Sequence, residues 1–104
     1  MKDDIMEITP TKPETKIPFK RLVGKSVVGN MGSVIGEVLD VVYDETTGKL
    51  ISLDIEPSEY SPIPPSDEYY KLIPYRIVLA VKDVVVIDES KITKVKLVSK
   101  NPDL

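Results

Sequence analysis

The chain has 104 residues, with 14 Lys and Arg, 17 Asp and Glu, and a formal net charge of −3. This length predicts one domain. The net negative charge argues against sequence-independent binding of nucleic acid, which needs a basic surface. Cysteine and histidine are both absent, which excludes disulfides, Cys or His zinc sites, cysteine nucleophiles and histidine acid–base chemistry.

The first 18 residues predict a flexible tail, because they hold three of the nine prolines and their apolar residues follow no sustained period. An N-terminal strand folded onto the body is the alternative. We expect the folded domain to span residues 19–98 and a C-terminal tail to cover residues 99–104. No apolar run approaches the roughly 20 residues of a membrane span, and no signal-peptide core is present, so we expect a cytoplasmic protein without direct membrane insertion.

The first half of the domain predicts a short strand within residues 22–28, a turn at 29–32 and a long strand over 34–43. Apolar residues on the long strand do not alternate cleanly. A β-bulge at Gly36–Glu37 would turn them to one inward face, since an isolated strand glycine often marks a bulge.

A hairpin loop is expected at residues 44–48, with Gly48 in the left-handed conformation. Clean alternation then predicts a strand over residues 49–56. On this strand Ile51, Leu53 and Ile55 are expected to face the core, and Ser52, Asp54 and Glu56 to face solvent.

Four prolines make residues 57–68 a long, stiff loop. No later segment shows a convincing helical period, and short strands separated by Gly and Pro turns are typical of an all-β barrel. The strands expected after the loop are 69–73, 77–81 (a strand or a single turn), 84–87, and a last one through Thr93, Val95 and Leu97.

Five short motifs follow one another in order: LVGKSVV at 22–28, GSVIGEVLDVV at 32–42, GKLI at 48–51, YKLIPY at 70–75 and VVVID at 84–88. Over residues 21–89 the chain resembles the PRC-barrel family, small β-barrels named for the photosynthetic reaction centre H subunit. The resemblance implies an all-β, PRC-type barrel of about six short antiparallel strands. It also implies that Gly24 and Gly32 serve turns, and the proline-rich loop departs from the family pattern.

The resemblance implies a non-catalytic adaptor, since the family is not known for catalysis. Its barrels occur in the reaction centre, beside an RNA-maturation module that docks a ribosomal protein, and in archaeal cell-division proteins. A chain of one barrel resembles the stand-alone archaeal members, which implies a role in archaeal cell division that links FtsZ-ring and membrane-anchor components. Because a chain this short cannot cover its apolar surface alone, we also expect a homodimer. A ribosome-maturation or RNA-processing factor is the alternative.

The absence of Gln and the presence of only two Asn residues are typical of a thermophile.

Acidic residues gather near one hairpin and could hold a divalent cation or perform acid–base chemistry. They alternate with apolar residues or lie in a turn, however, which indicates a solvated outer face. We therefore predict no enzyme activity and no catalytic, cofactor or metal site. The acidic residues are Asp40, Asp44, Glu45, Asp54 and Glu56.

The proline-rich loop predicts a partner-binding surface, because aromatic and apolar residues held by prolines lose little entropy on binding. The candidate residues are Tyr60, Ile63, Pro64, Pro65 and Tyr69. Capping of one open end of the barrel by Tyr60 and Ile63 is the alternative. A sheet edge offers a second mode, in which a partner strand or a second copy adds on.

One short basic stripe could favour the RNA-associated alternative. Residues 21–98 nevertheless carry nine basic and twelve acidic residues, whereas an RNA binder needs a basic surface. The stripe is more typical of lysines that solvate an edge strand. Its members are Lys91, Lys94, Lys96 and Lys100.

Overall fold

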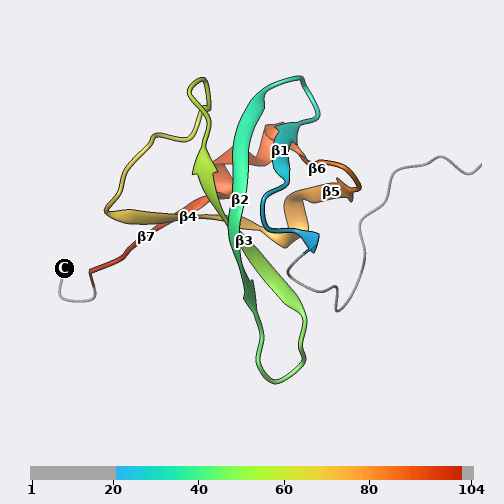
Figure 1. Ribbon diagram of the computed structural model, residues 1–104, viewed down its shortest axis with the longest axis vertical. Helices are drawn as coiled ribbons and strands as arrows, with labels where there is room; N and C mark the ends of the chain where they lie inside the picture. The colour runs from blue at the N-terminus through green and yellow to red at the C-terminus, as the bar shows by residue number, and fades with distance from the viewer. Residues whose placement is uncertain (1–20, 102–104) are drawn as a thin grey trace, which may run out of the picture.

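The computed structural model describes residues 21–101 (Figure 1). The predicted tail at residues 1–18 lies outside the described residues. No helix within the described part is long and apolar enough to cross a membrane. The elements of the described part are β1 (Ser26–Gly29), β2 (Val34–Tyr43), β3 (Leu50–Pro57), β4 (Tyr69–Pro74), η3 (Tyr75–Ile77), β5 (Val78–Val81), β6 (Val85–Ile87), η4 (Glu89–Lys94) and β7 (Lys96–Ser99).

All seven of these strands join one sheet in the order β5-β6-β1-β2-β3-β4-β7. Strands near both ends of this order supply side chains to a single core, so the sheet curls around it. The predicted all-β barrel is confirmed. Two details differ from expectation: the described residues form seven strands, and β1 pairs with β6 in parallel. The core consists of Leu22, Val27, Ile35, Val38, Leu53, Ile55, Ile63, Ile73, Tyr75, Ile77, Val78, Val85 and Ile87.

The bulges of β2 lie beside the predicted position, at Ile35 and Leu39. Against β1, Val27 pairs with Gly36 and Val28 pairs with Val34, which leaves Ile35 as the extra residue. Against β3, the paired residues skip Leu39 in the same way. Because each extra residue shifts the alternation, Ile35 and Val38 are buried while Leu39 is exposed.

Gly36 is required by the close approach of two backbones rather than by a bulge of its own. A Cβ atom at Gly36 would lie 2.2 Å from the carbonyl oxygen of Glu56 on β3. Three other glycines, Gly24, Gly32 and Gly48, adopt positive φ in turns, as expected. These four glycines thus serve the backbone conformation and packing of the fold.

The predicted inward face of β3 is correct for Leu53 and Ile55, which are fully buried, and wrong for Ile51. Ser52 pairs with Val42 and Leu50 pairs with Tyr43, so Ile51 is an extra residue in β3. The bulge exposes 47% of Ile51 and lets Leu50 pack against the core instead. Strict alternation fails here because the register is set by the neighbouring strand.

The last predicted strand is wrong at its start, because residues 89–94 form the 3₁₀-helix η4 and β7 begins at Lys96. Asp88 caps this helix: its side chain accepts hydrogen bonds from the backbone N–H of Ser90 at 3.1 Å and from the Ser90 hydroxyl at 2.6 Å. At its other end β7 includes Ser99, the first residue of the expected C-terminal tail.

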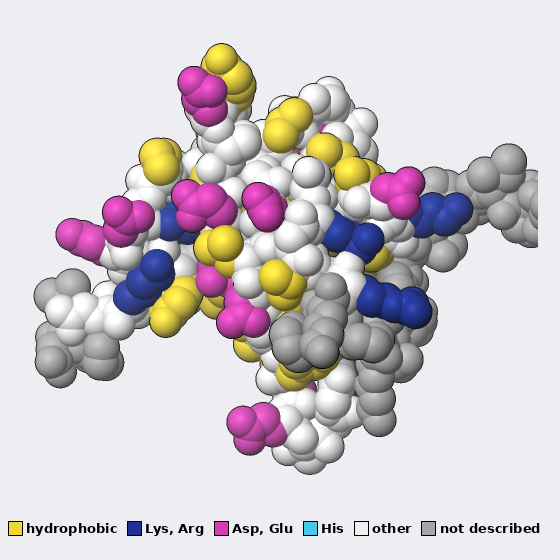
Figure 2. Space-filling view, in the orientation of Figure 1, with side chains coloured by type: hydrophobic (Ala, Val, Ile, Leu, Met, Phe, Trp, Pro, Cys, Tyr) yellow, Lys and Arg dark blue, Asp and Glu magenta, His cyan; other side chains and the backbone are white. Residues whose placement is uncertain are grey.

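Glu89 on η4 holds the turn between β1 and β2. Its carboxylate accepts hydrogen bonds from the backbone N–H of Met31 at 3.0 Å and from the Ser33 hydroxyl at 2.5 Å. The Asn30 side chain accepts one from the backbone N–H of Glu89 at 3.0 Å. The bonds to the carboxylate lower the pKa of Glu89, with the Ser33 hydroxyl as the main cause. Elsewhere on the surface, Figure 2 shows acidic and apolar side chains intermingled over the front of the sheet.

Candidate protein-binding groove

The proline-rich loop between β3 and β4 is held to the barrel near both ends. At the first end Ser58 donates from its backbone N–H to the carbonyl oxygen of Ile35 at 3.0 Å and from its hydroxyl to that of Val34 at 2.6 Å. At the other end the ammonium group of Lys71 donates to the carbonyl oxygen of Ser66. Lys71 is only 5% exposed, so this bond is shielded from water. The loop therefore presents a surface of fixed shape.

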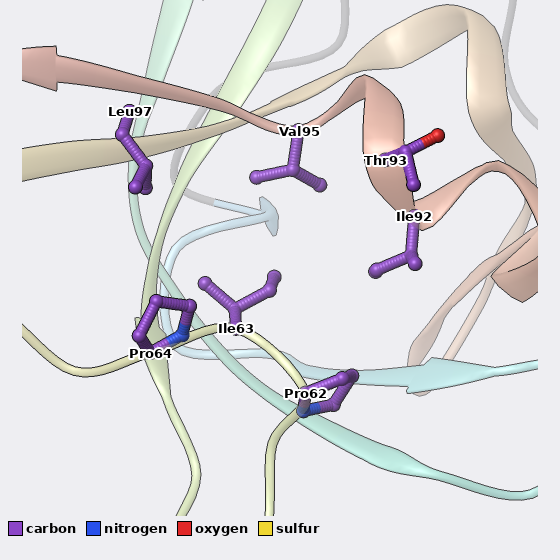
Figure 3. Close-up of a pocket in the computed structure, with 7 residues that line it drawn as sticks. All are labelled: Pro62, Ile63, Pro64, Ile92, Thr93, Val95 and Leu97. Atoms are coloured by element: carbon purple, nitrogen blue, oxygen red, sulfur yellow. The ribbon is translucent and has the colours of Figure 1, made fainter.

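An apolar cavity of about 240 Å³ lies between this loop and the segment that contains η4 and β7. Figure 3 shows the side chains of Ile63, Ile92, Val95 and Leu97 converging on one space, with the Thr93 hydroxyl directed away from it. A hollow lined in this way can accept an apolar or aromatic side chain. We call it the loop groove; its lining is Pro62, Ile63, Pro64, Ile92, Thr93, Val95 and Leu97.

The structure separates the five residues predicted for partner binding. Ile63 is 3% exposed and belongs to the core, so the capping interpretation holds for its side chain. Tyr60 is 83% exposed and caps nothing. Pro64 lines the loop groove, Pro65 is exposed beside it, and Tyr69 is half-buried on β4 opposite Ser99.

Sequence reasoning missed the far wall of the loop groove, which Ile92, Val95 and Leu97 supply. Their apolar spacing between lysines was visible but indicated an ordinary strand. Leu97 pairs with Lys71 on β4 and therefore shares the inner face of the sheet, yet 48% of it stays exposed. A large apolar side chain that faces inward without being covered is typical of an open binding surface.

The acidic residues near the hairpin do not converge on a cation site. Among residues 21–101 no three acidic side chains are close enough together to hold a metal ion. Asp44 accepts hydrogen bonds from the backbone N–H groups of Thr46 and Thr47, so it shapes its turn. Asp40 and Asp54 are paired neighbours on β2 and β3, in a shallow hollow of about 260 Å³ that Val41, Val42, Tyr70 and Leu72 also line.

Asp54, which lines this hollow, has a raised pKa. Burial raises its pKa, while a hydrogen bond from the backbone N–H of Lys71, at 3.3 Å, acts in the opposite direction. Neighbouring charges act too, with Lys100 lowering the pKa and Asp40 raising it. Asp54 thus shares the hollow with Asp40, and burial affects its pKa more than the neighbouring charges do.

The four lysines of the basic stripe are exposed on η4 and on the segment through β7. Lys91 lies 4.0 Å from a carboxylate oxygen of Asp88, and the ammonium group of Lys100 lies 5.3 Å from the centre of the Tyr70 ring. Since β7 is the last strand in the sheet order, its lysines border an edge, as the sequence predicts.

Comparison with known proteins agrees with this fold. The PRC-barrel domain matches residues 14–94. The uncharacterized protein MJ1118 of Methanocaldococcus jannaschii is 51% identical over 82 residues, which cover 79% of this chain and 92% of that protein. The family match covers the described chain from residue 21 through η4, which includes β1 to β6, and the chain belongs to the PRC-barrel domain family.

Proposed function

We propose that the chain is a non-catalytic protein–protein interaction adaptor that acts as a homodimer. The loop groove carries this proposal, because it offers an apolar hollow with half of Leu97 uncovered, close to the stiff loop that carries Tyr60. Partner surfaces commonly combine an exposed aromatic residue with a shaped apolar pocket. Membership of a family whose domains often serve as interaction modules supports it further.

The partner that fits is a protein segment with one apolar or aromatic side chain for the hollow. Because Ser58, Ser66 and Lys71 already hold the loop, little ordering cost remains on binding. Self-association is supported by size, since a domain of about 100 residues covers a smaller share of its apolar surface than a larger one does.

The cellular role that we propose is archaeal cell division, with the adaptor linking FtsZ-ring and membrane-anchor components in the cytoplasm of a thermophile. Its support is the resemblance to stand-alone archaeal barrels and the identity to an archaeal protein. A ribosome-maturation or RNA-processing role is the second candidate, favoured by the four exposed lysines of the basic stripe. Binding of RNA that weakens steeply with salt would support that second role.

The test is capture of partners from the source organism by an immobilised wild-type chain and two variants. Tyr60→Ala combined with Leu97→Ser removes the exposed aromatic ring and opens the apolar wall without touching the buried Ile63. Leu79→Ser is the matched control, because Leu79 lies on β5 and is exposed to a similar extent, 43% against 48% for Leu97.

We expect a protein that the wild-type and Leu79→Ser chains retain and that the double variant loses, with all three chains folded by circular dichroism. Equal retention by all three would exclude the loop groove as the binding surface. Recovery of ribosomal RNA in place of a protein would favour the second candidate.

A further inference from the structure

One row of side chains crosses four neighbouring strands on the outside of the barrel. Asp40 on β2 pairs with Asp54 on β3, Asp54 pairs with Leu72 on β4, and Leu72 pairs with Lys96 on β7. Directly paired residues point to the same side of a sheet, and Asp54 lies between the buried Leu53 and Ile55. The row therefore faces outward, with negative charge at one end, an apolar middle and positive charge at the other end.

Apolar side chains border this row on the same face. Val42, Tyr70 and Val98 each lie two positions from a member of the row, so their side chains share its side of the sheet. All three are exposed, Tyr70 by 42% and Val98 by 43%. An antiparallel sheet that faces only water carries mostly polar residues there, so this face is typical of a covered surface.

The charges of the row have no ionic partner of their own within residues 21–101: the ion pair of the described region joins Lys91 and Asp88. Burial is the chief cause of the raised pKa of Asp54, and the charges of Lys100 and Lys71 offset it only in part. A cation brought to this hollow would stabilise both carboxylates. Lys100 already lies over the ring of Tyr70 and lowers the pKa of Asp54, whereas Lys96, the cation of the row itself, lies at its far end on β7.

We propose that this face is the surface on which a second copy of the chain docks, about a two-fold axis that runs along the strands between β3 and β4. The proposal rests on the homodimer of the proposed function and names its interface. A row with opposite charges at its ends complements its own reversed image, and a two-fold axis provides that reversal. Asp40 and Lys96 lie the same number of strands from this axis, one on each side of it. Because neighbouring strands are evenly spaced, about 4.8 Å apart, rotation about the axis sets the Lys96 of each copy over Asp40 of the other.

The packing that results is an aligned pair of sheets about 10 Å apart. The apolar Leu72 of each copy then lies against Asp54 of the other, at the hollow that both residues line. Each dimer contains two Asp40–Lys96 pairs related by symmetry. These pairs favour this orientation of the two copies, because they set opposite charges against each other at both ends of the row.

Charge reversal tests this arrangement by sedimentation equilibrium at low salt. Asp40→Lys and Lys96→Glu each place like charges across the axis, and we expect each to raise the dimer dissociation constant at least about tenfold. An equimolar mixture of these two variants should regain wild-type dimerisation, because opposite charges meet again at both pairs. Asp83→Lys and Lys82→Glu, in the exposed turn between β5 and β6, make the same charge changes and should leave dimerisation unchanged.

The outcomes separate this interface from the function on which it rests. Wild-type dimers that resist both reversals would overturn the interface and leave the homodimer standing. A wild-type chain that stays monomeric at high micromolar concentration would overturn both, and the capture experiment on the loop groove would still decide the adaptor role. Weakening by both reversals without recovery in the mixture would show a different partner on this face and would also overturn the proposal.

Discussion

Truncation of two apolar residues on β3, Leu53 and Ile51, should have very different costs, although strict alternation assigns both to the core. Leu53 is fully buried, so Leu53→Ala deletes buried methyl groups and leaves a cavity. Such truncations cost about 2–5 kcal/mol of unfolding free energy. Ile51 is already 47% exposed because of the bulge. Since complete burial of such a side chain contributes about 1.5–3 kcal/mol, its half-burial amounts to about 1 kcal/mol, with no cavity.

The measurement is urea unfolding of the wild type, Leu53→Ala, Ile51→Ala and the outer-face control Ser52→Ala. Midpoint and slope together give the free energy of unfolding, and a constant slope confirms that the folded states are comparable. Two protein concentrations separate dissociation of a dimer from unfolding of the chain. Equal costs at Leu53 and Ile51 would refute the bulge and restore the alternating register for the whole strand.

Three further changes test other parts of the structure. Gly36→Ala should destabilise the fold in thermal melts by more than Gly32→Ala, because its Cβ atom would lie 2.2 Å from a carbonyl oxygen, whereas Gly32 has open space and loses about 1–2 kcal/mol to its positive φ. The pKa of Glu89 is lowered, chiefly by Ser33. The ionised Glu89 carboxylate therefore stabilises the fold at pH values above the ordinary glutamate pKa, and this stabilisation is lost as the pH falls through the lowered pKa. Urea midpoints of the wild type and Glu89→Gln should therefore differ at neutral pH and converge in acid; a constant difference would assign the effect to shape instead. The pKa of Asp54 is raised, chiefly by burial. The ionised form of Asp54 therefore destabilises the fold at pH values above the raised pKa, and this cost disappears as the pH falls below the ordinary aspartate pKa. Asp54→Asn should thus match or exceed wild-type stability at neutral pH and lose any advantage in acid; a variant less stable than the wild type at neutral pH would contradict this.

Local patterns in the sequence predicted most of the strands, because apolar stretches and the turn residues between them mark where the strands lie. Gly48 at its positive φ and Leu53 and Ile55 in the core follow from such local signals. The bulges at Leu39 and Ile51 could not be predicted in the same way. An extra residue in one strand is fixed by its pairing with the next strand, and pairing is a property of the assembled sheet.

The candidate site was predicted in part for a similar reason. The stiff loop is visible in four prolines, and its exposed Tyr60 is where an interaction surface was expected. Ile63 faces the core instead, because the loop folds over the open end of the barrel. The far wall of the groove comes from residues 92–97, about thirty positions later, and only the pairing of β7 with β4 brings it there.

The adaptor function is tested most directly by methyl NMR of the chain with the partner that it captures. Binding in the loop groove should shift the methyl signals of Ile63, Ile92, Val95 and Leu97 together, since these side chains converge on the same space. The methyl signals of Leu79 on β5, away from the groove lining, should stay unchanged. Shifts at Leu79 with the four groove residues unaffected would contradict the account.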